Sequence, residues 1–109
     1  VGTNDARLDV PVATYKTNMA AAIAAAQITG DVVLVMGPPS SDPTTFANQP
    51  AYLAAIQQLG AQFGCMVIDE FSSFGQTWQT TFMADSLHPN NAGQAKMARD
   101  LALPIYMAS

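Results

Sequence analysis

The chain has 109 residues, of which 50% are hydrophobic and only 11% are charged. This composition excludes an intrinsically disordered chain and indicates one domain or part of one. The net charge is −4 and the four basic residues are scattered, which argues against nucleic-acid binding. The one cysteine, Cys65, excludes an internal disulfide and lies in an apolar run, where a buried, unreactive thiol is expected.

The first half of the chain predicts a helix followed by a strand. Residues 15–28 are rich in alanine and carry larger apolar side chains at helical spacing, and Gly30 is a natural stop. Residues 32–36 are five apolar residues in a row. A short continuous run of this kind is typical of a strand that is covered on both faces, as in a parallel sheet.

The next unit repeats this order. Residues 40–49 read as a polar loop, and Pro50 suits the first turn of a helix over residues 50–63, which Gly64 would end. Residues 65–68 predict a second short buried strand. The segment 71–83 mixes aromatic and polar residues and predicts no single element.

The last element is a predicted helix over residues 92–103. Asn90 or Asn91 is expected to cap its start, and Pro104 is expected to end it. The whole order is helix, strand, helix, strand, helix, with Val1 at the end of an orphaned strand. This order predicts half of a doubly wound α/β domain. Because two strands make a poor sheet, further strands are expected upstream or on another chain.

Near the C-terminus the chain reads Asp85-Ser86-Leu87-His88-Pro89. His88 is the only histidine, and a carboxylate three residues away can fix its tautomer and stabilise the imidazolium. The other ring nitrogen is then free to take a proton from a hydroxyl nucleophile. Taken alone, the pair has a competing interpretation, in which Asp85 caps a turn and His88 is an ordinary surface residue.

The N-terminus reads Gly2-Thr3-Asn4-Asp5. At the carboxyl end of a parallel strand, Gly2 would allow a tight turn, and the amide of Asn4 could donate to a developing oxyanion. Taken alone, these residues are common turn formers, and an ordinary turn is then the better explanation.

In this order the two motifs resemble the C-terminal half of an SGNH (GDSL-type) hydrolase. That family carries a Gly-x-Asn-Asp block after its third strand and an Asp-x-x-His-Pro block before its last helix. The resemblance implies a three-layer α/β/α domain with a parallel sheet of flavodoxin-like type. It implies that His88 is the base, Asp85 its orienting carboxylate and Asn4 with Gly2 the oxyanion site, while Asp5 braces the turn. It implies no metal and no organic cofactor.

The chain departs from this family in two respects. The family's nucleophile lies in a Gly-Asp-Ser block after its first strand, and none of the six serines of this chain has that setting. The family's second oxyanion donor is a glycine after its second strand, and that block is also absent from this chain. Residues 1–109 are therefore expected to be the C-terminal part of a single hydrolase domain. The nucleophile would lie on an upstream polypeptide or a companion chain, and the isolated chain would be inactive.

Two functions follow from these observations. The first is serine-dependent ester hydrolysis, with acetylated carbohydrate as a plausible substrate and small lipid esters equally allowed. The second is a non-catalytic module that binds glycan within a larger extracellular or viral assembly. The absence of a nucleophilic serine from this chain is the reason for considering it. The compartment stays open, with an extracellular or viral surface favoured. No membrane span is expected, because the longest weakly polar stretch, residues 19–26, is too short.

Two further groups of residues carry open interpretations. Asp69 and Glu70 follow the second strand and could bind a cation or line a substrate groove, although a solvated strand end is the simpler interpretation. The aromatic residues between this strand and residues 85–89, the acid–base block, could stack against a sugar or line an acyl pocket, or could be ordinary packing. They are Phe71, Phe74, Trp78 and Phe82.

Overall fold

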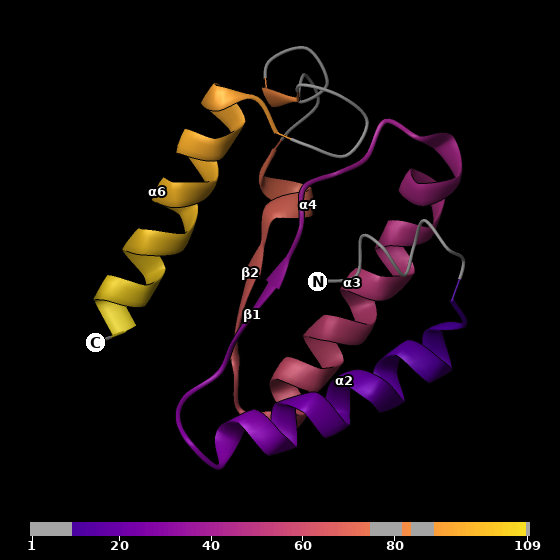
Figure 1. The fold of residues 1–109 in the computed structure, drawn as a ribbon, viewed down its shortest axis with the longest axis vertical. Helices are drawn as coiled ribbons and strands as arrows, with labels where there is room; N and C mark the ends of the chain where they lie inside the picture. The colour runs from indigo at the N-terminus through magenta and orange to yellow at the C-terminus, as the bar shows by residue number, and fades with distance from the viewer. Residues whose placement is uncertain (1–9, 75–81, 84–88, 109) are drawn as a thin grey trace.

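The computed structural model describes residues 10–74, 82–83 and 89–108 (Figure 1). Within these residues the chain forms four main helical segments and two strands. In chain order they are α2 (Val12–Gln27), β1 (Val33–Met36), α3 (Pro43–Phe63), β2 (Met66–Asp69), α4 (Glu70–Ser73) and α6 (Asn91–Ala108).

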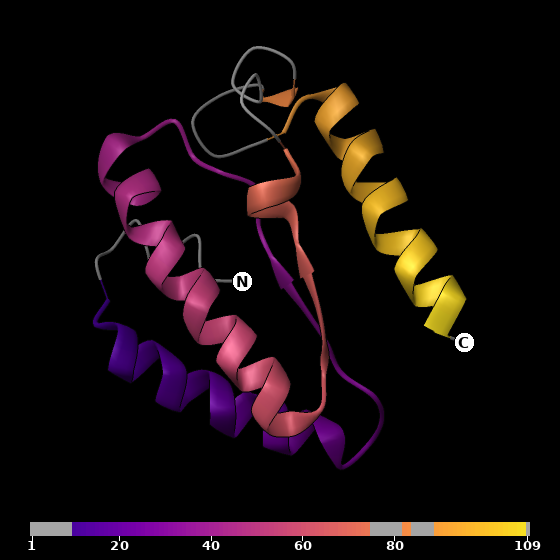
Figure 2. The ribbon, with the colours of Figure 1, turned by 180° about the vertical axis from the view of Figure 1, so that it is seen from behind.

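The two strands pair in parallel, with a register that runs from Val33 opposite Met66 to Met36 opposite Asp69. Figures 1 and 2 show the strands between α6 on one side and α2 with α3 on the other. This confirms the predicted α/β fold with a parallel sheet between helical layers. The described part of the chain supplies two strands of this sheet.

The core lies between the sheet and the layer formed by α2 and α3. Leu34 and Met36 alternate along β1 onto this face and are 4% and 0% exposed. Tyr15 of α2 and Tyr52 of α3 meet edge to face, with ring centroids 4.9 Å apart, and the Tyr52 hydroxyl donates to the carbonyl of Val10. These contacts fix α2 and α3 against one side of the strands.

The start of α3 differs from the prediction. The segment 40–49 was expected to be a loop with the helix beginning at Pro50, but α3 begins at Pro43 and includes Pro50. The physical reason is the cap: the Asp42 carboxylate accepts hydrogen bonds from the N–H and the hydroxyl of Thr45 at 2.9 and 2.8 Å. Pro43 then occupies the first turn, where a missing N–H costs nothing.

The end of α6 also differs from the prediction. Pro104 was expected to end this helix, but α6 continues through it to Ala108. A proline inside a helix removes one backbone hydrogen bond and usually bends or ends the helix. The apolar residues around it are exposed, with Leu103 at 62% and Met107 at 75%.

The connections between the remaining elements follow ordinary helix chemistry. α3 ends at Gly64, which has a φ of 68° and takes the left-handed conformation that favours glycine. β2 passes directly into the short helix α4, whose first turn is capped by Asp69 through Ser72 N–H at 2.9 Å. In the described part of the chain, no helix has the length and apolar character needed to cross a membrane.

Candidate active site

The carboxyl ends of β1 and β2 lie at the same end of the sheet because the strands are parallel. In Figure 1, the start of α3, the short helix α4 and the start of α6 gather at this end. In open α/β sheets, ligands bind beyond the carboxyl ends of the strands. The structure therefore places the first residues of α6, which directly follow the acid–base block, at the edge where a site is expected.

The predicted site residues themselves lie outside the described residues. Gly2 and Asn4 belong to the segment 1–9, and Asp85 and His88 belong to the segment 84–88. Their convergence on one point thus remains a prediction. What the structure describes is the framework on either side of the acid–base block.

The described residues on either side of segment 84–88 meet in an antiparallel bridge. Met83 pairs with Pro89, and the N–H of Asn90 donates to the carbonyl of Phe82 at 2.8 Å. Met83 and Pro89, on either side of residues 84–88 in sequence, are therefore held next to each other.

The start of α6 is attached closely to the same bridge. The Asn90 side chain accepts from the N–H of Gly93 at 2.8 Å, which confirms Asn90 as the cap. A Cβ on Gly93 would lie 2.2 Å from the carbonyl oxygen of Phe82 and 2.8 Å from Cβ of Pro89. Only glycine allows this approach, so the helix start and the bridge form one unit.

A second framework element is the loop that follows β1. Gln49, which is 0% exposed on α3, accepts from the N–H of Ser40 at 2.9 Å and donates to the carbonyl of Pro38 at 3.0 Å. The Ser40 hydroxyl in turn accepts from the N–H of Asp42 at 3.1 Å. One buried amide thus holds the backbone at the carboxyl end of β1.

A polar cluster connects α4 to α6. Lys96 Nζ lies 2.9 Å from Asp100 Oδ2 and 2.9 Å from Ser73 Oγ, and Ser73 Oγ donates to the same carboxylate oxygen at 3.0 Å. The Lys96 ammonium also lies 5.8 and 5.9 Å from the ring centroids of Phe74 and Phe82. This cluster joins the end of α4 to α6, and it lies against Phe74 and Phe82, which precede the Asp-x-x-His motif in sequence.

Glu70 is the unusual member of this region. It is 0% exposed, and neither of its carboxylate oxygens has a hydrogen-bond partner among the described residues. Burial raises the pKa of Glu70 from 4.5 to about 7, and the adjacent carboxyl of Asp100 adds to the increase. The simple interpretation of Asp69 and Glu70 as a solvated strand end is therefore wrong for Glu70, whose side chain is fully buried.

The pKa of the Asp100 carboxyl is shifted in the opposite direction. Burial alone would raise the pKa of its carboxyl, but the hydrogen bonds from Lys96 and Ser73, together with the neighbouring Glu70 carboxyl, outweigh burial and hold the pKa below 3.8. Two neighbouring carboxyls with pKa values moved apart favour one proton on Glu70 and a charged Asp100.

A cleft of about 280 Å³ lies beside these carboxyls, between the end of β2 and α6. It is lined by Ile68, Asp69, Glu70, Ser73, Arg99, Asp100, Leu103 and Pro104. Among the residues that the structure describes, no three acidic, histidine or cysteine side chains are grouped as a metal site would require.

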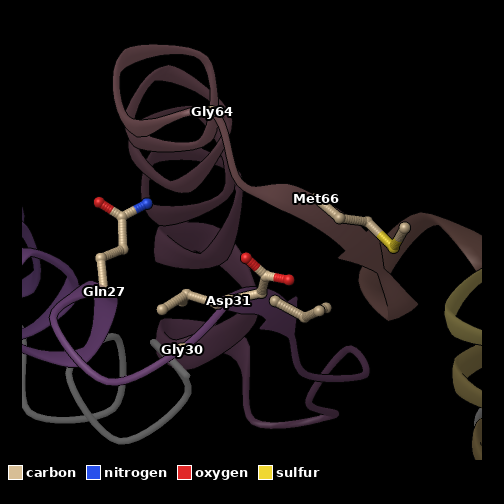
Figure 3. A pocket seen from close by; sticks show the side chains of 7 residues that line it. Gln27, Gly30, Asp31, Gly64 and Met66 are labelled. Carbon is tan, nitrogen blue, oxygen red and sulfur yellow. The ribbon is translucent and has the colours of Figure 1, made fainter. Parts of the chain in front are cut away.

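A second cavity, of about 340 Å³, lies at the opposite end of the sheet (Figure 3). Gln27, Asp31, Gly64 and Met66 line it, around the amino ends of the strands. The Gln27 side-chain amide already donates a hydrogen bond to the carbonyl of Phe63 at 2.9 Å. Since this is the wrong end of the sheet for an open α/β site, the cavity is not part of the candidate active site.

The aromatic residues have separate roles. Phe74 is 2% exposed and packs on Phe82 with ring centroids 5.2 Å apart, as ordinary packing predicts. Phe71 instead contacts Phe46 of α3, with centroids 5.6 Å apart and Phe46 43% exposed. Trp78 lies outside the described residues.

Sequence reasoning did not single out Lys96, Asp100 or Ser73. The four-residue spacing of Lys96 and Asp100 on one helix was a readable signal for an ion pair. The contribution of Ser73 had no such signal, because it depends on how α4 meets α6.

Two comparisons with known proteins agree with this framework. The model of the GDSL-like Lipase/Acylhydrolase family matches residues 1–96. The crystal structure of the lipase/acylhydrolase from Enterococcus faecalis is similar, with a TM-score of 0.82 and 25% sequence identity. The match covers 95% of this chain and 57% of that chain. A search of the curated proteins finds no match.

Proposed function

Since this chain belongs to the GDSL-like lipase/acylhydrolase family, we propose that it supplies the acid–base part of a serine-dependent ester hydrolase. Family membership supports hydrolase activity in general. The observation that supports the proposal is the bridge between Met83 and Pro89, two residues that flank the Asp-x-x-His motif in sequence.

In the proposed reaction, a serine hydroxyl outside these residues attacks the ester carbonyl while His88 takes its proton. Asp85 accepts from the other ring nitrogen of His88 and stabilises the imidazolium that forms. The amide of Asn4, on a turn made possible by Gly2, donates to the oxyanion. His88 then returns the proton to the leaving alkoxide, and water hydrolyses the acyl-serine by the same route.

The serine is proposed to come from an upstream segment or a companion chain with a Gly-Asp-Ser block. Val33 on the strand face away from α3 is 37% exposed, and Leu103 and Ile105 of α6 are 62% and 42% exposed. These exposed apolar side chains support the proposal, because further strands and helices of the same domain could cover them.

The substrate class is proposed as an ester, with acetyl groups on carbohydrate as one candidate and small lipid esters as another. The test measures hydrolysis of a chromogenic acetate by the protein with the upstream segment present. His88→Ala should lower the rate by about 10²–10⁴-fold and Asn4→Ala by about 10²–10³-fold. Equal rates in the unchanged protein and His88→Ala would end the proposal.

The alternative, a glycan-binding module without turnover, is favoured by one observation: no serine of this chain lies in a Gly-Asp-Ser block. It predicts glycan binding that persists in His88→Ala, together with no ester cleavage by the protein that carries the upstream segment. A Gly-Asp-Ser block in that segment would count against it.

A further inference from the structure

α6 contacts the rest of the described chain mainly through its first half. Figures 1 and 2 show it on the side of the strands opposite α2 and α3, and none of its residues belongs to the core between the sheet and those helices. Among the α6 residues whose burial is described, only Gly93 is buried. Further along, Leu103 and Met107 are 62% and 75% exposed. Moving α6 about its start would therefore leave that core intact.

A set of hydrogen bonds ties the first half of α6 to α4. Lys96 Nζ lies 2.9 Å from Asp100 Oδ2 and 2.9 Å from Ser73 Oγ, and Ser73 donates to the same Asp100 oxygen at 3.0 Å. The Lys96 and Asp100 side chains are 16% and 28% exposed, so water screens their charges less than it screens a surface pair. This tie requires a charged Asp100 carboxylate beside Lys96.

Glu70 lies beside this tie as a second carboxyl group. Its side chain is fully buried, and neither carboxylate oxygen has a hydrogen-bond partner among the described residues. Burial first and the neighbouring Asp100 second raise the pKa of Glu70 to about 7. A negative charge on Glu70 would be cut off from water and would face a second carboxylate, so the observed packing suits the protonated form.

The other charged groups around Glu70 come from β2 and α6. Asp69, at the end of β2, raises the pKa of Glu70 further, whereas the ammonium of Lys96 lowers it. Lys96 already donates to Asp100 and Ser73. Arg99 is exposed and lines the cleft between the end of β2 and α6. Repulsion between Glu70 and Asp100 thus remains once Glu70 ionises.

We propose that protonation of Glu70 controls whether α6 lies against the end of β2. With its proton, Glu70 is a neutral side chain beside Asp100, and α6 stays in place. Without it, the two carboxylates repel each other. Moving α6 away widens the cleft of about 280 Å³ that both residues line, separates the two charges and exposes Glu70 to water. This inference is independent of the proposed hydrolase function.

The start of α6 is the point about which the helix moves. The backbone of Gly93 lies against the carbonyl oxygen of Phe82, and the side chain of Asn90 accepts from the Gly93 N–H at 2.8 Å. Neither contact involves a titrating group, so both persist when Glu70 loses its proton. The movement therefore separates the second half of α6 from β2 while the first turn stays attached.

Amide hydrogen exchange of the 109-residue chain tests the proposal, because it measures opening residue by residue. Protection factors, corrected for the intrinsic effect of pH on exchange, are compared between Met97 and Leu101 of α6 and Ile56 and Leu59 of α3. The α6 amides should be less protected, because they open without loss of the core. Opening should release the Glu70 proton between pH 4.5 and about 7, so protection of α6 should fall by up to about tenfold per pH unit in this window and level off above it.

Glu70→Gln keeps a neutral side chain of similar size and should make the protection of α6 independent of pH in this window. Asp31→Asn is the matched control, since it removes an exposed carboxyl at the opposite end of the sheet and should leave the fall unchanged. Glu70 is the only glutamate, so selective ¹³C labelling of glutamate gives one carboxyl NMR signal that follows its ionisation.

Asp100→Asn provides a second variant if Glu70→Gln does not fold. It removes the neighbouring charge, so the midpoint of the Glu70 carboxyl signal and the end of the fall should both move to lower pH. Methyl signals of Ile23 and Ile56, which are buried in the core between the sheet and the layer of α2 and α3, report whether each variant is folded.

Three results would overturn the proposal. Protection of α6 that is constant between pH 4.5 and 7 would show that α6 opens without release of the Glu70 proton. The same fall in Glu70→Gln as in the unchanged chain would assign it to another group. Equal protection of the α6 and α3 amides at every pH would show that α6 separates only when the whole protein unfolds.

Discussion

The backbone N–H of Asn90 donates to the carbonyl oxygen of Phe82 at 2.8 Å, across the five residues that carry the acid–base motif. Gly93 lies against the same oxygen, so the carbonyl of Phe82 contacts both Asn90, which follows the acid–base motif, and the first turn of α6. This relationship makes α6 a support for the candidate site as well as a layer of the fold.

Gly93→Ala is expected to destabilise the protein. A methyl group would lie 2.2 Å from a backbone oxygen that no side-chain rotation can move. Alanine would favour the helix by about 1 kcal/mol, but overpacking of this kind typically costs about 1–3 kcal/mol, so the steric cost should win. Urea unfolding measures the difference. Gly30→Ala, where no atom lies within 4 Å, is the control, and a more stable Gly93→Ala would contradict the expectation.

The stability of the protein should depend on the ionisation of Glu70. Its pKa is raised from 4.5 to about 7 by burial first and by Asp100 second, so the folded state holds a proton that the unfolded state releases. This contribution is complete below pH 4.5 and is lost as the pH rises through about 7. The free energy of unfolding should therefore fall across this window.

Glu70→Gln should remove this fall, because the amide is neutral at every pH in the window. At pH 8 the variant should be more stable than the unchanged protein by about 1–3 kcal/mol, and near pH 4 the two should be similar. Urea titrations at a series of pH values make the comparison. Parallel pH profiles for the two proteins would show that Glu70 does not carry the dependence.

Gln49→Ala is expected to release the loop after β1. The substitution leaves the N–H of Ser40, a residue 1% exposed, without the Gln49 acceptor, and leaves a cavity where a fully buried side chain had been. A lost partner for a buried donor costs about 1–3 kcal/mol. Gln57→Ala, an exposed position on the same helix, should be close to neutral. Thermal unfolding of the two variants tests this, and equal melting temperatures would refute it.

Asn90→Ala should weaken the start of α6. The Asn90 side chain accepts from the N–H of Gly93 at 2.8 Å, and the loss of such a cap typically costs about 1 kcal/mol. Hydrogen exchange of the Gly93 amide should become faster, which reports the cap locally. The neighbouring Asn91 is exposed, so Asn91→Ala is the matched control. Similar exchange rates in both variants would assign the cap no role.

Much of the fold was readable from local patterns. The apolar run that contains β1 and the second run that contains β2 predicted two buried parallel strands. Both strands form and pair in parallel, but only Leu34, Met36 and Ile68 in them are buried. Asn90 was correctly predicted as a cap. Two errors concern proline: Pro50 and Pro104 were expected to start and to end helices, yet both lie inside them. Neighbouring helical residues can outweigh the loss of one hydrogen bond.

The sequence by itself determined the order of strands and helices and the family resemblance, and it predicted the acid–base motif, since these depend on residue types and their spacing along the chain. Only the tertiary structure decided that Glu70 is buried and that Ser73, Lys96 and Asp100 meet beside the base of that motif. Burial and contact between distant residues depend on how α4 and α6 pack, and no local spacing encodes that packing. For this reason the supporting residues of the candidate site emerged from the structure, although its chemistry had been predicted from the sequence.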